Sequence, residues 1–343
     1  MKTKLSLILA FSLAGTLALG AATVRIVQTN AAGDSVMLID PATNKVVGEI
    51  KGIEVNHGAA VAPDGSKFYI TNEAESTLDV ADAKTLAVTK HIPLTNHPNN
   101  VAVSKDGKRV YVAIVAGAGA VDVIDTATLT RVKSIRTEGG IHNVYVTPDG
   151  KWVVAGSIPG KKIHVIDQKT EEISWMLPTS DGVRPMAFDT NADGSTKRIF
   201  VQISNINGFE TVDFATHKLV DKIALPEAPA GEKVTEGLQG APAHGLIVTP
   251  DGKTLGVLSK MNSRIYFYSL PDLKLQGDAK VGHHPDWVTG TPDGKRFYVA
   301  NAGSNSVSVV DVATRKELLQ IPVGQVPKRN ITAILPALPT TNQ

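Results

Sequence analysis

The chain has 343 residues, with 35 lysines and arginines against 33 aspartates and glutamates. This balance lacks the broad basic field that non-specific nucleic-acid binding requires. The absence of cysteine excludes disulfides, thiolate metal ligands and a cysteine nucleophile.

The first residues have the pattern of an export signal. Lys2 and Lys4 precede an apolar run over 5–19, and small residues follow at 20–22. The run is shorter than the ~20 residues of a membrane-spanning helix, and no cysteine follows it for lipid attachment. The sequence therefore predicts a signal peptide over 1–22 and a periplasmic or secreted protein that does not span the membrane after cleavage. An N-terminal membrane anchor is the alternative.

A repeat of about 42 residues fills the rest of the chain. Asp-Gly pairs recur with spacings of 42, 43, 44, 58 and 42 residues, at Asp64, Asp106, Asp149, Asp193, Asp251 and Asp293. Aspartates that end apolar strands keep the same period, at Asp40, Asp82, Asp125, Asp167, Asp213 and Asp311. Two independent markers with one period indicate a repeat architecture.

Each repeat predicts four short strands. In the last complete repeat, strands are expected over 286–291, 296–300, 306–310 and 316–323, and residues 292–295 have the composition of a hairpin turn. Four strands per 40 to 45 residues is the spacing of a β-propeller blade.

The motifs within this repeat resemble those of the YVTN-type β-propeller family. The namesake motif reads Tyr-Ile-Thr-Asn at 69–72 and Tyr-Val-Ala-Asn at 298–301, and Pro-Asp-Gly-Lys precedes the second copy. The resemblance covers nearly the whole mature chain and implies an all-β propeller. It implies little about function, because propellers of this kind include binding proteins, surface proteins and enzymes.

Seven blades are expected, with four antiparallel strands each. The first blade has three strands in 24–53 and takes its inner strand from 324–336, which closes the ring without an open edge. The propeller spans 23–336, and 337–343 forms a tail. The other blades are expected at about 54–94, 95–138, 139–179, 180–229, 230–281 and 282–323.

Five of the nine histidines fall where inner strands begin, at the mouth of the central channel. His57, His142 and His244 lie seven residues before a turn aspartate, and His97 and His284 lie two residues further back. The predicted ligand-binding positions at these two levels are His57, His97, His142, Arg184, His244, His284, Asp286 and Lys328.

Three chemical interpretations of these histidines remain open. A repeat that duplicates itself also duplicates a histidine that only packs at a strand start, so a structural role is one. Contact with a small ligand or substrate is another. The third is a metal site in which His57, His142 and His244 hold Zn, Cu or Fe, with Asp286 as a further ligand or orienting group.

Other polar residues could contribute to a site or could simply lie at the surface. The insertion at 226–241 is interpreted either as a binding loop on the histidine side or as a tolerated surface insertion. Glu73 and Glu75 share one loop and are expected to be solvated charges. His283 adjoins His284, and the remaining three histidines, His91, His164 and His217, are expected at the surface.

The first functional hypothesis is an exported monomeric binding module that recognises a small molecule, peptide or protein at the channel mouth. One alternative is a metal-assisted hydrolase, lyase or oxidoreductase that uses the same histidines, with Glu73, Glu236 or Asp286 as a base. Another alternative is an envelope protein with a structural or interaction role. No dinucleotide-binding fingerprint, phosphate-binding loop or serine-hydrolase elbow occurs in the sequence.

Overall fold

The computed structural model describes residues 22–232 and 241–336. The predicted signal peptide, the tail and the half of the insertion that contains Glu236 lie outside these residues. In the described part no helix is long and apolar enough to cross a membrane.

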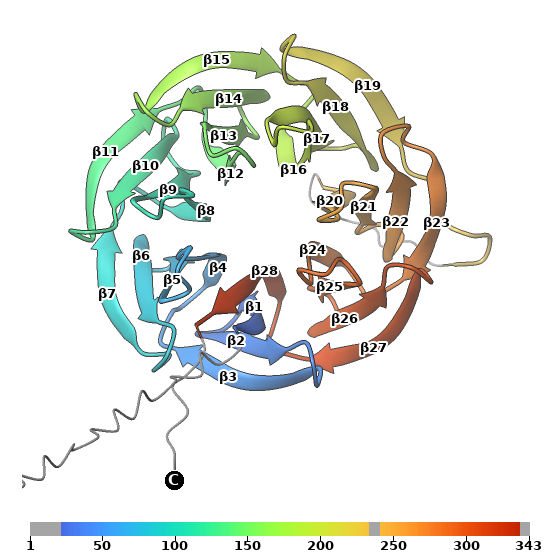
Figure 1. The fold of residues 1–343 in the computed structure, drawn as a ribbon, viewed down its shortest axis with the longest axis horizontal. Coiled ribbons are helices and arrows are strands. Elements are labelled where there is room, and N and C mark those ends of the chain that lie inside the picture. Colours follow the sequence, from blue (N-terminus) through green and yellow to red (C-terminus); the bar gives the residue numbers. More distant parts are fainter. Residues whose placement is uncertain (1–21, 233–240, 337–343) are drawn as a thin grey trace, which may run out of the picture.

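Seven four-stranded antiparallel sheets form a closed ring around a central channel, which confirms the predicted all-β, seven-bladed fold (Figure 1). The inner strand of each sheet lines the channel, and the fourth strand lies at the rim (Figure 1). Blade 1 combines strands from the two ends of the chain, whereas each of blades 2 to 7 is one continuous segment.

The blades contain the following strands. Blade 1 is built from β28 (Pro327–Leu335), β1 (Thr23–Asn30), β2 (Ser35–Asp40) and β3 (Lys45–Lys51). Blade 2 is built from β4 (Asn56–Val61), β5 (Lys67–Asn72), β6 (Thr77–Asp82) and β7 (Val88–Pro93). Blade 3 is built from β8 (Pro98–Val103), β9 (Arg109–Ile114), β10 (Ala120–Asp125) and β11 (Thr130–Arg136). Blade 4 is built from β12 (Ile141–Val146), β13 (Trp152–Ser157), β14 (Lys162–Asp167) and β15 (Glu172–Pro178). Blade 5 is built from β16 (Val183–Thr190), β17 (Thr196–Ile203), β18 (Gly208–Asp213) and β19 (Lys218–Ala224). Blade 6 is built from β20 (Ala243–Val248), β21 (Thr254–Ser259), β22 (Arg264–Ser269) and β23 (Leu275–Lys280). Blade 7 is built from β24 (Pro285–Gly290), β25 (Arg296–Asn301), β26 (Ser306–Asp311) and β27 (Lys316–Pro322).

The recurrent aspartates form the turns that shape each blade. Asp293 accepts hydrogen bonds from the Thr291 hydroxyl (2.5 Å) and from the Lys295 amide (3.1 Å), and Gly294 takes the left-handed φ of 70° that this turn requires. Such turns join the inner strand to the second strand at the end away from the histidines. We call the face where inner strands begin the histidine face and the opposite face the turn face.

The core lies between neighbouring blades. Phe267 of β22 stacks on Phe297 of β25 with ring centroids 5.9 Å apart, and both rings are fully buried. Each blade therefore buries its faces against its neighbours, which explains why a single repeat does not form a stable unit.

Ring closure depends on β28. This strand pairs with β1 along nearly its whole length, from Thr23 opposite Leu335 to Asn30 opposite Pro327. No turn joins the two strands, so hydrogen bonds and packing alone close the first blade.

Deleting residues 324–343 should open the ring, because it removes the inner strand of blade 1 and exposes the edge of β1. We expect the variant to lose its cooperative thermal transition, as followed by circular dichroism. A chain that ends at Pro336 is the matched control and should melt within about 2 °C of the full chain. An unchanged melting curve for the larger deletion would contradict closure by β28.

Candidate functional site at the channel mouth

The predicted site positions lie where inner strands begin on the histidine face. His57, His142 and His244 are each the second residue of their strands, β4, β12 and β20. Asp286 and Lys328 hold the same place in β24 and β28. Because the inner strands surround one channel (Figure 1), this common register brings residues from five blades to one mouth.

A carboxylate lies between two of the histidines. Glu73, in the loop after β5, pairs with the Nδ1 of His57, and its other oxygen lies 3.3 Å from the Nε2 of His97. The Glu73 side chain is only 13% exposed, so the expectation that it is a solvated surface charge was wrong. Burial alone would raise the pKa of Glu73, but the interactions with His57 and His97 together outweigh burial and lower it.

A second buried carboxylate pairs with two lysines. Asp286 places Oδ1 at 2.6 Å from the Nζ of Lys260 and Oδ2 at 2.9 Å from the Nζ of Lys328. Burial alone would raise the pKa of Asp286, but the two ammonium groups hold it well below its usual range. Lys260 is 7% exposed, and this burial lowers its pKa. The sequence placed Lys260 only in a loop, so its part in the site was missed.

Arg329 is the largest fully buried side chain at the channel mouth, and sequence reasoning missed it as well. It is 2% exposed, and its guanidinium stacks over the ring of Trp287 at 4.2 Å from the centroid. It donates to the Oδ1 of Asn143 (2.7 Å) and to the Oδ1 of Asn99. Burial lowers the pKa of Arg329 to about 10, which leaves it charged at neutral pH.

These two amides fix the protonation pattern of their neighbouring histidines. A guanidinium only donates, so the amide oxygens face Arg329 and the amide nitrogens face away from it. The Nδ2 of Asn143 therefore donates to the Nδ1 of His142 (2.7 Å), which places the ring hydrogen of His142 on Nε2. The Nδ2 of Asn99 lies 3.5 Å from the Nε2 of His57, while the Nδ1 of His57 faces Glu73.

His244 has the opposite tautomer. Its Nδ1 lies 2.7 Å from the carbonyl oxygen of Asp286, which only accepts, so Nδ1 carries the hydrogen and Nε2 keeps the lone pair. The rings of His142 and His244 meet edge to face with centroids 5.8 Å apart. Burial lowers the pKa of each well below its usual value, and the charge of Arg329 adds to this effect. Two adjacent neutral histidines thus present one donor and one acceptor.

The remaining predicted residues lie around this group. Arg184 donates from Nε to the Ser204 hydroxyl (2.7 Å), and burial lowers its pKa. Burial lowers the pKa of His284 to about 4, with the charge of Lys260 adding to the shift. The Nε2 of His284 is buried and has no hydrogen-bond partner in the described residues.

The histidines expected at the surface divide into two groups. His91 and His217 are exposed as expected, and His217 stacks on Trp175. His164 was wrongly predicted, because it is fully buried on β14 and its Nε2 accepts the Glu138 amide (3.0 Å). The third strand of a blade faces the neighbouring blade, so even a polar residue there is enclosed.

No three histidine or acidic side chains in 22–232 and 241–336 are grouped closely enough to hold a metal ion. His57 faces Glu73, and His142 faces Asn143, while the positive charge of Arg329 acts on all three histidines of the predicted set. The metal site of His57, His142 and His244 stays a prediction, with no support from this grouping.

The ring, its closure and the charged channel mouth define a seven-bladed β-propeller with a candidate site on its axis. A family model described as a seven-bladed β-propeller lactonase matches residues 120–335, which is more than half of the chain. The chain belongs to this lactonase family. The YVTN-type assignment stays a resemblance in sequence.

Individual relatives are more distant. A protein of Salmonella typhi described as uncharacterized protein YncE is 28% identical over 98 residues, which is 29% of this chain and 28% of the relative. The match therefore spans less than a third of that relative. The periplasmic gluconolactonase of Pseudomonas aeruginosa is 20% identical, with a TM-score of 0.72, over 92% of this chain and 100% of that one. The hydrazine synthase of Kuenenia stuttgartiensis is 23% identical, with a TM-score of 0.74, over 89% and 99%. At these identities the two structures show the fold alone.

The buried histidines should make the protein less stable as the pH falls from 7 to 5. Their folded pKa values are lowered, so below about pH 6.5 the unfolded chain binds protons that the folded chain does not. Each such histidine should reduce the free energy of unfolding by at most about 1.4 kcal/mol per pH unit in this window, and the largest effects should come from His142 and His244. Urea unfolding at pH 7, 6 and 5 measures the slope. In His244→Gln the free energy of unfolding should fall less steeply with pH. Equal stability at pH 7 and pH 5 would contradict the conclusion that these histidines are neutral in the folded protein.

Proposed function

We propose that this protein is exported and binds a small hydroxylated organic anion, such as a sugar acid, at the channel mouth. The observation that carries the proposal is the pairing of complementary histidines with surplus positive charge. His142 offers Nε2–H and His244 offers an Nε2 lone pair, which together match the acceptor and donor of one hydroxyl group. Around them the cationic side chains outnumber the carboxylates.

The charges at the mouth favour an anion. Burial lowers the pKa of His57, His142 and His244, and among the described residues the mouth has four cationic side chains and two carboxylates, Glu73 and Asp286. The cations are Arg184, Lys260, Lys328 and Arg329. Desolvated cations strengthen the attraction for a carboxylate or phosphate. A small molecule is favoured over a peptide because these groups lie around the mouth of a single channel rather than along an extended groove.

The direct test is calorimetric titration with D-gluconate at low salt, with D-glucose as the neutral control. Gluconate should bind and glucose should not. Arg184→Gln should weaken gluconate binding about tenfold or more, because an ion pair to a desolvated arginine is lost. The matched control is Arg109→Gln, which removes an arginine that pairs with Asp125 and Glu171 on the turn face. Equal binding of gluconate and glucose, or no effect of Arg184→Gln, would refute the proposal.

Lactone hydrolysis is a second candidate, favoured by the family and by the tautomer of His244. The Nε2 lone pair of His244 would accept a proton as a water oxygen attacks the lactone carbonyl, and the nearby cations would stabilise the oxyanion. As the ring C–O bond breaks, the leaving alkoxide would take the proton from the protonated His244, which restores the neutral imidazole, while the Nε2–H of His142 would donate a hydrogen bond. The product is the hydroxy acid that the binding proposal already requires.

Hydrolysis of D-glucono-1,5-lactone, followed as acid release at constant pH, tests this activity. We expect His244→Gln to lower kcat by about 100-fold, since a general base contributes on that order. His91→Gln, on the rim of blade 2, is the control and should leave kcat unchanged. Lactone turnover at the buffer rate with gluconate binding intact would leave the protein a binding module and exclude this activity.

A further inference from the structure

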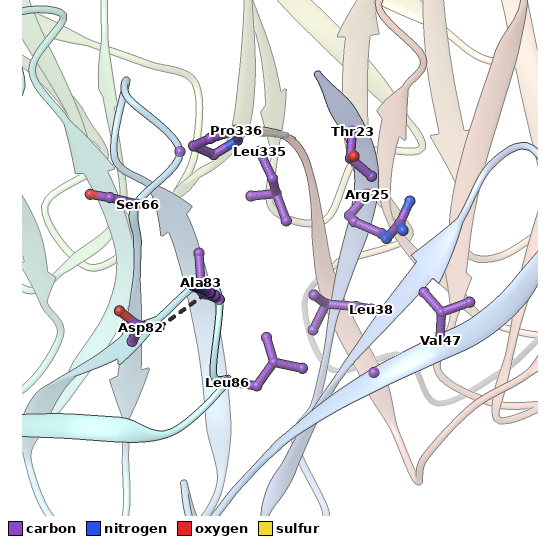
Figure 2. A pocket seen from close by; sticks show the side chains of 13 residues that line it. Thr23, Arg25, Leu38, Val47, Ser66, Asp82, Ala83, Leu86, Leu335 and Pro336 are labelled. Atoms are coloured by element: carbon purple, nitrogen blue, oxygen red, sulfur yellow. Dashed lines mark hydrogen bonds between the residues drawn. The ribbon is translucent and has the colours of Figure 1, made fainter. Parts of the chain in front are cut away.

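A pocket of about 430 Å³ opens on the turn face, between blades 1 and 2. Figure 2 shows Leu38, Leu86 and Leu335 around it, with Ala83 on the blade 2 side and Arg25 on the blade 1 side. It lies at the opposite end of the inner strands from the histidines. We call this place the closure seam, because it adjoins the pairing of β28 with β1.

Gly48 of β3 lines the pocket at a position that is variable in the repeat. Gly48 lies opposite Leu38, just after a bulge, and its equivalents in the other fourth strands are Lys90, Lys133, Trp175, Asp221, Gly277 and Leu319. In blades 3 and 4 this position carries a large side chain, whereas blade 6 has Gly277 there. Lys133 donates to the Glu171 carbonyl (2.7 Å), and Trp175 stacks on His217 with centroids 4.0 Å apart. At the closure seam Gly48 has no side chain of its own, and the Leu86 side chain packs against it.

A cause of the pocket is the absence of a turn between β28 and β1. In neighbouring repeats the turn glycine packs on the preceding blade's own turn, as Gly107 does on Pro63 and Gly294 does on Pro250. Gly65 instead packs on Leu335 and Pro336, the end of β28. The space below β1, beside Thr23, therefore has no turn to cover it.

The lining has the chemistry of a site for a small apolar molecule with an acidic group. The inner walls are aliphatic, from Leu38, Leu86 and Leu335. The charged lining residues are Arg25, Lys84 and Asp82. Asp82 accepts hydrogen bonds from the amides of Lys84 and Thr85 (3.0 and 2.8 Å). Arg25 pairs with Asp40 through one guanidinium nitrogen (3.3 Å), so Lys84 and the rest of the Arg25 guanidinium would meet an acidic group. The volume lies within the ~300–1,000 Å³ of small-molecule pockets.

The geometry points to a second ligand site at the closure seam, which takes an amphipathic organic anion with its apolar body between Leu38, Leu86 and Leu335. Such a ligand would contact both β28 and blade 2, so it would hold the ring closed. This site is separate from the channel mouth in place and in ligand chemistry, because the mouth is polar and the seam is aliphatic.

Fluorescence titration with 8-anilinonaphthalene-1-sulfonate, an aromatic anion, tests the site. We expect one bound probe per chain. In Gly48→Trp the dissociation constant of the probe should rise at least tenfold, because the new side chain would occupy the pocket at the position that Trp175 holds in blade 4. Gly48→Lys introduces the residue that blades 2 and 3 have at this position, Lys90 and Lys133. It should weaken probe binding in the same way, and it replaces Gly48→Trp as the test if the tryptophan variant does not fold. The matched control is Lys133→Trp, the same position in a blade that already has a large side chain there, and it should bind the probe as wild type does.

Three comparisons decide the chemistry and the occupant. Arg25→Gln should weaken binding of the sulfonate probe more than binding of the neutral probe N-phenyl-1-naphthylamine. D-gluconate should displace neither probe. Wild-type binding by both Gly48 variants would overturn the proposal, as would displacement by gluconate. A severalfold gain in probe affinity when the chain ends at Pro336 would also overturn it, because the chain's own terminus would then be the occupant.

Discussion

The buried guanidinium of Arg329 is the interaction on which the channel mouth depends. Removing an arginine from water is costly, and here the cost is offset by stacking on Trp287 and by hydrogen bonds to two asparagines. Those bonds orient the amides of Asn99 and Asn143, and the amides in turn determine which nitrogen of His142 carries its hydrogen. The same positive charge helps to keep the surrounding histidines neutral. One side chain therefore sets the donor and acceptor pattern of the site and much of its electrostatics.

Arg329 also links the site to ring closure. Its backbone amide and carbonyl both bond to the Thr29 hydroxyl (3.0 Å each), and its carbonyl accepts a further bond from Gln28 (3.0 Å). These bonds hold β28 to β1, while the Arg329 side chain reaches residues of blades 3 and 4. A loosened β28 would thus change the histidine tautomers as well as the edge of blade 1. Stability and site chemistry are coupled through one residue.

The fold could be predicted from the sequence because its signals are local and repeated. Each Asp-Gly turn and each aspartate at a strand end reports its own blade, and the missing inner strand of blade 1 identified the closing partner. The convergence of His142 and His244 followed from the same register. Lys260 and Arg329 were not found in this way, because their polar partners lie in other blades and nothing in their own repeat indicates the pairing. Glu73 was named only as a possible base, and its enclosure between His57 and His97 was not predicted. The one available signal was that Arg329 places a large cation one residue beyond the histidine level, where blades 2 and 6 have Gly58 and Gly245.

The departures from the repeat are therefore where this chain differs chemically from a generic propeller. A strict repeat would place the same side chain at every inner-strand start, and the result would be a symmetric channel with no defined orientation for a ligand. Here Asp286 and Lys328 replace histidine in adjacent blades, which makes one side of the mouth charged and leaves the other to neutral imidazoles. On the opposite face, Gly48 lines the closure seam at the position where blades 3 and 4 have Lys133 and Trp175. Because each substitution lies on a rigid sheet, it creates a local site without disturbing the ring that supports it.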